Sequence, residues 1–332
     1  MLVATKGGPE TPSSRYRIYA LLPLLAARGW TIELLTPSTV RSHRFTNLVR
    51  DLRLGLHGWD VLLVQRPGRR REETVTLRLA AIRAHVVALD VDDPVERRGA
   101  FAVAASRAHV VFAGSSAAAA EHDDAARVEL ISTPLDPSCY AVQRPSNDPP
   151  VIGWIGDGPA YFEALVRMVR SVARAPGPWS LQVVGTKGNT ALEQGLREAA
   201  PGKSLELVSE IAWEQEDLVA QTVAGFDIGL VPFRNAEGAS FKTVQYLAAG
   251  AVPLVESGGE GERHVREALG LDAPVVHPGD TDAVAAALAR LRDPRVRQEL
   301  GARGRLAAFQ SYSQARAAAR IDAILREELD AR

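Results

Sequence analysis

The chain has 332 residues, of which 46% are hydrophobic and 24% charged, and its formal net charge is −1. This composition is typical of a soluble globular protein, and the length predicts two domains. The balanced charge argues against a protein that binds nucleic acid, and the single cysteine, Cys139, excludes an intramolecular disulfide.

No apolar run is long enough to cross a bilayer, and Lys6 follows the first apolar residues too closely for a signal peptide. We therefore expect a cytoplasmic protein whose association with membranes is at most peripheral.

Short apolar runs alternate with helical patterns through the first half of the chain. Between the first two runs, Ile18, Leu21, Leu22 and Leu25 repeat with the spacing of a helix face, and Gly29 ends the helix. This alternation predicts a doubly wound parallel sheet. Its buried strands are expected at residues 2–5, 31–36, 60–65, 85–90 and 109–114.

The segment 132–150 holds five prolines in a polar stretch, which predicts a linker. A second series of strands then follows at residues 151–156, 180–185, 204–209, 226–233, 251–256 and 273–278. After Asp280 the pattern is helical, with an apolar stripe at Ile321, Ile324, Leu325 and Leu329. We expect two Rossmann-like α/β domains that face a ligand cleft at the carboxyl ends of their strands.

Three short segments combine lysine with glycine where strands end or helices begin: Lys6-Gly7-Gly8, Thr186-Lys187-Gly188, and Gly238 to Lys242. Glycine-rich turns that enter helices present backbone N–H groups to phosphate, so at least one segment is expected to contact a ligand phosphate. The alternative is that these are ordinary loop residues. None of them is a Walker motif.

The first predicted helix begins with Ser13 or Ser14 as its N-cap, followed by Arg15 and Arg17. Two arginines in a first turn oppose the helix dipole, and an anion from the cleft would remove this conflict. The alternative places both arginines in solvent. Arg66, at a strand end, is also a candidate for facing the cleft.

The fourth strand ends in Asp90-Val91-Asp92-Asp93-Pro94. Asp93 before proline is expected to cap a helix, whereas Asp90 and Asp92 could bind Mg²⁺. The pair also resembles the nucleophile motif of haloacid-dehalogenase-type phosphatases, but that motif follows the first strand. We favour a structural or acceptor-contacting role over a metal, and the seven histidines show no metal-ligand spacing.

The stretch FDIGLVPFRNAEGASFKTVQYLAAGAVPLVE, residues 226–256, resembles the carboxyl-terminal domain of retaining glycosyltransferases of family 4, the glycosyl transferases group 1. The run from Gln245 to Val255 is close to that family's Glu-Ala-Met-Ala-x-Gly-x-Pro-Val-Val, in a subgroup with Gln-Tyr in place of the second motif Glu. Residues 12–30 and 90–93 are more loosely similar to the amino-terminal domain.

The resemblance implies a GT-B fold. An acceptor-binding domain is expected at residues 1–140, a nucleotide-sugar domain at 141–310, and a helix at 311–332 that packs back on the first domain. In the family's paired motif, the first Glu contacts the donor sugar and the second binds the ribose hydroxyls. These positions fall on Glu237 and Gln245, and an amide at the second position lacks the charge-assisted bond of a carboxylate.

The resemblance also implies the roles of other residues. The expected catalytic residues are Glu237, Lys187 and Asp90. The expected donor-binding residues are Gly156, Asp157, Gly185, Lys187, Ile211, Trp213, Arg234, Gly238, Ala239, Ser240, Phe241, Lys242 and Gln245. The expected acceptor-binding residues are Gly7, Gly8, Ser14, Arg15, Arg17, Arg66 and Asp92.

These features favour a hexosyl-type glycosyltransferase that moves a sugar from a nucleoside-diphosphate sugar to a small-molecule, natural-product or saccharide acceptor. Retention of anomeric configuration is expected, with no cofactor and no metal. The alternatives are a nucleotide-sugar 2-epimerase, which would need acid and base groups in the cleft, and a two-lobed small-molecule binding protein, a class that is usually exported.

Overall fold

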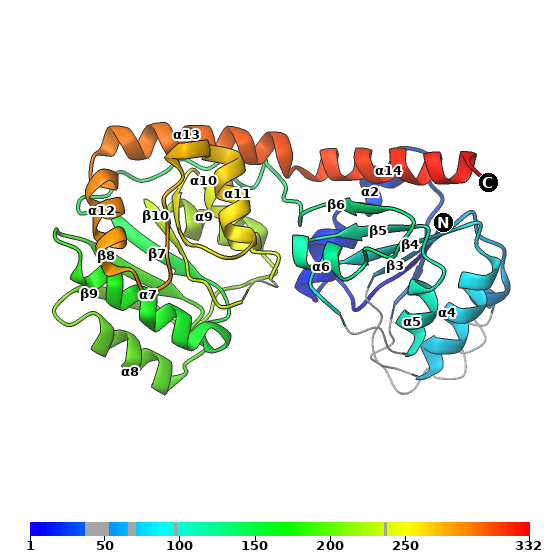
Figure 1. The fold of residues 1–332 in the computed structure, drawn as a ribbon, viewed down its shortest axis with the longest axis horizontal. Helices are drawn as coiled ribbons and strands as arrows, with labels where there is room; N and C mark the ends of the chain where they lie inside the picture. The colour runs from blue at the N-terminus through cyan, green and yellow to red at the C-terminus, as the bar shows by residue number, and fades with distance from the viewer. Residues whose placement is uncertain (37–52, 66–70, 96–98, 236–237) are drawn as a thin grey trace. The chain divides into compact units, whose positions relative to one another are not determined.

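The computed structural model describes residues 1–36, 53–65, 71–95, 99–235 and 238–332. The chain divides into two compact units. Met1–Leu135, residues 238–239 and Tyr312–Arg332 belong to the first unit, and Asp136–Ala236 and Ser240–Ser311 belong to the second. Each unit contains a six-stranded parallel sheet with flanking helices (Figure 1). The predicted two-domain α/β architecture is therefore confirmed.

In the first unit the strand order is β2-β1-β3-β4-β5-β6. The chain passes from β1 to β2 on one side and continues with β3 on the other, so the strand order reverses between β1 and β3. The strands are β1 (Leu2–Ala4), β2 (Glu33–Leu35), β3 (Val61–Gln65), β4 (Val86–Val91), β5 (Val110–Ala113) and β6 (Val128–Leu130). The five predicted strands are present. β6 was not predicted because it is a three-residue, partly exposed edge strand without an apolar run.

The first predicted helix is interrupted. Thr11 precedes its first turn with Pro12 as the first helical residue, so the predicted cap at Ser13 or Ser14 is wrong. The helices of this unit are α1 (Pro12–Ser14), the π-helical turn η1 (Arg15–Tyr19), α2 (Leu22–Ala26), α4 (Arg71–Arg83), α5 (Gly99–Ala105), α6 (Ser116–Ala120) and α14 (Gln314–Asp330).

The helix α14 belongs to the first unit although it ends the chain. It runs beside α2 (Figure 1) and buries the predicted apolar stripe, with Ile321, Ile324 and Leu325 in the same core cluster as Ile18 and Phe112. Burial of such side chains contributes about 1.5–3 kcal/mol each, which fixes the terminal helix on the sheet.

In the second unit the strand order is β12-β11-β10-β7-β8-β9, and it reverses between β7 and β10. All six predicted strands are present as β7 (Val151–Ile155), β8 (Ser180–Val184), β9 (Ser204–Val208), β10 (Ile228–Val231), β11 (Val252–Glu256) and β12 (Val275–Val276). The helices are η3 (Pro159–Tyr161), α7 (Phe162–Arg174), α8 (Thr190–Ala199), α9 (Glu216–Ala224), α10 (Phe241–Ala249), α11 (Glu260–Leu269), η4 (Gly270–Asp272), α12 (Thr281–Leu291) and α13 (Pro294–Ser311).

Within the described ranges, none of the helices has the length and apolar character that crossing a membrane requires.

Candidate functional site

The reversal of strand order in the second unit gathers several predicted donor residues. Gly156 and Asp157 directly follow β7, Arg234 follows β10, and Lys242 lies in the first turn of α10. Open α/β sheets bind ligands at the carboxyl ends of the strands where the order reverses. We call this region, formed by residues 154–161, 185–187, 232–235 and 240–242, the β7–β10 site.

The ammonium group of Lys242 is the most unusual feature of the β7–β10 site. It lies 3.6 Å from the centre of the Tyr161 ring and 4.6 Å from that of Trp154. Its Nζ is buried and has no hydrogen-bond partner among the residues that the structure describes. Burial, together with the charge of Arg234, lowers the pKa of Lys242 to about 7, and Asp157 opposes this shift. Two aromatic faces attract a cation, but they do not replace a counter-charge.

The indole N–H of Trp154 also lies in this region. Trp154 is fully buried, and its Nε1 has no acceptor within the described part of the chain. Buried N–H groups are almost always hydrogen-bonded in native proteins. Two neighbouring donors in this state, Trp154 and Lys242, indicate that the region is built to receive hydrogen-bond acceptors.

Two of the predicted glycines allow close contact between loop backbones. Gly185 has a φ of +100°, and a Cβ atom added to it would lie 1.9 Å from the carbonyl oxygen of Gly156. The same atom would lie 3.1 Å from the ring of Trp213. Because any side chain at 185 would separate these segments, glycine is needed here. The contact brings the loop after β8 against the loop after β7.

The predicted catalytic Lys187 is paired within the domain. Its Nζ lies 2.8 Å from the carboxylate of Asp157, and both side chains are about half exposed. Such exposed pairs are worth about 0–1 kcal/mol, so a ligand anion can compete for Lys187 at little cost. In the next loop, Trp213 donates from Nε1 to Glu210 at 2.6 Å, and Ile211 is partly buried.

The start of α10 holds the remaining predicted donor residues. Ser240 is in the left-handed region with a φ of 49°, and its hydroxyl lies 2.8 Å from that of Thr243. Gly238 has open space around it. The partly buried residues Ala239 and Phe241 flank Ser240. Glu237 lies outside the described residues.

Gln245, predicted to bind the ribose, is mostly buried on α10. Its Nε2 donates to the hydroxyl of Tyr140 at 3.0 Å. In this orientation one N–H of the amide is used by the protein, and the carbonyl oxygen is the atom of Gln245 that can accept a ligand hydroxyl. This contact could not be predicted from the sequence, because the two residues are 105 positions apart.

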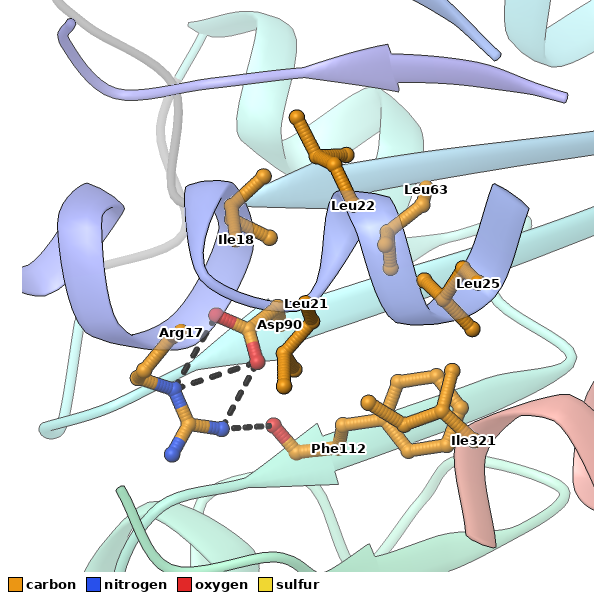
Figure 2. Close-up of a pocket in the computed structure, with 9 residues that line it drawn as sticks. All are labelled: Arg17, Ile18, Leu21, Leu22, Leu25, Leu63, Asp90, Phe112 and Ile321. Carbon is orange, nitrogen blue, oxygen red and sulfur yellow. Dashed lines mark hydrogen bonds and ion pairs between the residues drawn. The ribbon is translucent and has the colours of Figure 1, made fainter. Parts of the chain in front are cut away.

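In the first unit, Arg17 and Asp90 form a buried ion pair (Figure 2). Arg17 Nη2 lies 2.7 Å from Asp90 Oδ1, and Nε lies 3.1 Å from both carboxylate oxygens. The guanidinium also donates to the carbonyls of Ile131, at 2.7 Å, and Phe112, at 3.4 Å. Burial disfavours the charged guanidinium, but Asp90 more than compensates and raises the pKa of Arg17.

This pair changes the interpretation of both residues. The anion that resolves the conflict with the helix dipole is Asp90 of the protein itself. Arg17 and Asp90 are each only 3% exposed and are bonded to one another, so neither presents the unpaired charge that the predicted contact with an acceptor would use. The pair borders a small pocket that is otherwise apolar, lined by Ile18, Leu21, Leu22, Leu25, Leu63, Phe112 and Ile321 (Figure 2). Asp90 therefore contributes to the core of the domain.

The other predicted acceptor residues lie at the carboxyl end of β1 and β4. Gly7 and Gly8 follow β1, and Asp92 follows β4 and is partly buried. Ser14 is fully buried, and its hydroxyl lies 2.7 Å from Gln65 Oε1. The guanidinium carbon of Arg15 lies 4.9 Å from the centre of the Tyr16 ring. Arg66 lies outside the described residues.

Sequence reasoning missed Trp154, Tyr161 and Gln65. One feature of the sequence could have identified Gln65: it is the polar last residue of a strand that is otherwise wholly apolar.

Comparison with known proteins finds a family that resembles most of the second unit. Residues 149–293 match the family described as glycosyl transferases group 1. A sequence search of curated proteins finds no match.

Solved glycosyltransferase structures share the fold of the whole chain. The structure of Anabaena HepE in complex with UDP and glucose is 13% identical, with a TM-score of 0.70 and coverage of 98% of this chain and 99% of that one. A glycosyltransferase from Rickettsia africae is 10% identical, with a TM-score of 0.73 and coverage of 99% and 98%. A trehalose-6-phosphate synthase studied for glycosyltransfer with retention is 12% identical, with a TM-score of 0.60 and coverage of 95% and 86%.

Proposed function

We propose that this chain, whose residues 149–293 match the glycosyl transferases group 1 family, transfers a sugar from a nucleoside-diphosphate sugar to an acceptor bound by its first domain. The observation that carries the proposal is the buried Lys242 ammonium, which has no partner among the described residues and lies where the strand order reverses. A diphosphate is the anion that this position would receive.

The chemistry of transfer accounts for the charges at the β7–β10 site. Breaking the bond between sugar and diphosphate leaves an oxocarbenium-like sugar and a diphosphate that gains negative charge. Fixed cations around the leaving group stabilise that charge as it develops. Lys242 would contact the diphosphate from inside the site, with Arg234 and Lys187 at its exposed edge, and the backbone N–H groups at the start of α10 would add further donors.

The same site offers surfaces for the nucleoside. The ring of Trp213 lies against Gly185, one residue beyond β8, where a base could stack on it. The carbonyl oxygen of Gln245 would accept one ribose hydroxyl. Glu237 stays a prediction as the group that contacts the donor sugar.

We further propose that transfer retains the anomeric configuration and needs no metal. Retention is supported by the fold shared with the trehalose-6-phosphate synthase, whose reaction is described as glycosyltransfer with retention. Independence from metal is supported by Asp90, because Arg17 already occupies the carboxylate of this candidate Mg²⁺ ligand. The acceptor is expected to be a small molecule or a saccharide.

Thermal shift with a panel of nucleotides tests the proposal. We expect UDP, GDP, dTDP or ADP, or one of their sugar conjugates, to raise the melting temperature in EDTA, because a ligand that binds the native state stabilises it. At 100 times its Kd the preferred nucleotide would add about 2.7 kcal/mol. If no member of the panel changes the melting temperature, the donor-site assignment is wrong.

A further inference from the structure

The first domain also has a buried hydrogen-bond donor without an acceptor in the described part of the chain. It lies where the strand order of its own sheet reverses, as the β7–β10 site does in the second domain. Gln65 ends β3, next to β1, where the strand order reverses. The side chain is 1% exposed, and its Nε2 has no hydrogen-bond partner within the described ranges. The hydroxyl of Ser13, two positions beyond the Thr11 cap, is in the same state.

The orientation of the Gln65 amide is fixed by its surroundings. Its Oε1 accepts from the backbone N–H of Lys6 at 3.2 Å and lies 2.7 Å from the Ser14 hydroxyl. A backbone N–H can only donate, so the oxygen must face Lys6 and the nitrogen must face away from it. The Nε2 therefore presents two N–H groups that require an oxygen acceptor.

The charge of the surrounding loop favours an anionic acceptor. Lys6 and Arg15 lie on either side of the Gly7–Ser14 segment, whereas Arg17 is neutralised by Asp90. The acidic residue of the loop, Glu10, accepts from the backbone N–H of Gly8 at 3.1 Å. Asp92 and Asp93 are also close enough to act on Arg17, and they follow β4 rather than lie in this loop.

We propose that Gln65 Nε2 and the Ser13 hydroxyl bind a carboxylate or phosphate oxygen of the acceptor substrate. This inference rests on the proposed function, because it specifies the chemical class of the acceptor in that reaction. It makes Gln65 a specificity-determining residue that selects acceptors carrying an oxyanion over neutral ones.

The test uses Gln65→Glu, which keeps an oxygen for Lys6 and Ser14 and replaces only the donating nitrogen. Sodium phosphate and sodium acetate are titrated at ionic strength balanced with sodium chloride, and the melting temperature is followed. All proteins carry Lys242→Met, which weakens anion binding at the β7–β10 site and leaves that background the same in every variant. Gln194→Glu is the matched control, because Gln194 makes an exposed contact with Glu198 on α8 of the other domain.

We expect one of the two anions to raise the melting temperature in a saturable way, and Gln65→Glu to weaken its apparent affinity at least tenfold. Ser13→Ala should weaken it less, and Gln194→Glu should leave it unchanged. A response to phosphate alone identifies a phosphate-bearing acceptor, and a response to acetate alone identifies a carboxylate.

The inference is wrong if neither phosphate nor acetate raises the melting temperature more than sodium chloride does. It is also wrong if Gln65→Glu binds the active anion as tightly as its parent. Because the nucleotide panel is measured separately on the protein with Lys242 intact, a negative result here leaves the proposed function standing. If instead no nucleotide of the panel binds, the proposed function is wrong, and the anion titration still shows whether the first domain binds an oxyanion.

Discussion

Replacing Lys242 with methionine is expected to stabilise the protein without ligand and to weaken nucleotide binding at the same time. Methionine has a similar length and fills the space against Trp154 and Tyr161 without bringing a charge into it. The wild-type protein keeps a buried ammonium with no hydrogen-bond partner in the described part of the chain. Loss of one charge-assisted contact to a diphosphate should weaken binding about ten- to a hundredfold.

The gain in stability should depend on pH with a definite sign. Burial lowers the pKa of Lys242 from 10.5 to about 7 in the folded state, so the unfolded chain holds the proton more tightly. The unfavourable free energy of burying the protonated ammonium is present in full below pH 7 and disappears as pH rises toward 10.5. The variant should gain on the order of 3 kcal/mol near pH 6 and much less near pH 10.

Thermal or urea denaturation at pH 6 and pH 10 measures this difference, with Lys203→Met as the control. Lys203 is a lysine of the same domain and lies in the turn before β9. The interpretation of Lys242 fails if Lys242→Met loses stability at pH 6, or if it binds nucleotide as tightly as the wild type.

Replacing Arg17 with methionine is expected to have the largest effect on stability in the first domain. The change leaves Asp90 as a buried carboxylate without its cation, and breaking a buried ion pair in this way costs about 3–5 kcal/mol. It also removes the donors to the carbonyls of Ile131 and Phe112. Urea denaturation of the variant measures the loss.

A double variant, Arg17→Met with Asp90→Leu, should be more stable than the sum of the single changes predicts, because it leaves no buried charge. Arg320→Met is the control. It breaks an exposed pair with Glu129 and should cost less than about 1 kcal/mol.

Asp90→Asn separates the structural role from a catalytic one. If Asp90 acts through the ion pair, the variant loses stability, and any transfer activity that it loses follows its folded fraction. If Asp90→Asn keeps the wild-type melting temperature but loses transfer, Asp90 is a catalytic residue as the sequence predicted.

The strands could be predicted because a parallel sheet buries both faces of each strand, which leaves continuous apolar runs such as residues 60–65 and 226–233. Residues that end these strands, such as Gly156 and Asp157, could be placed at the carboxyl edge for the same reason. Edge strands like β6 are too short and too exposed to leave this pattern.

Pairings across the fold could not be predicted. Arg17 and Asp90 are 73 positions apart, and each looked like a ligand-binding residue when considered alone. Lys242 was identified as a candidate, but its burial between Trp154 and Tyr161 depends on how η3 follows β7. The nitrogen of Gln65 lacks an acceptor among the described residues because Lys6 and Ser14 hold the amide oxygen. These two residues are 59 and 51 positions from Gln65, so the sequence does not indicate the contacts.

Proton uptake on nucleotide binding tests most directly whether Lys242 receives the diphosphate. Isothermal titration calorimetry at pH 8, in two buffers that differ in ionisation enthalpy, measures the protons taken up per nucleotide bound. With a pKa of about 7, most Lys242 is neutral at pH 8 before binding, and a bound diphosphate would protonate it. We predict an uptake of about 0.9 proton by the wild type and essentially none by Lys242→Met. Equal uptake by the two proteins, or no uptake by the wild type, would contradict the assignment of Lys242 to the diphosphate.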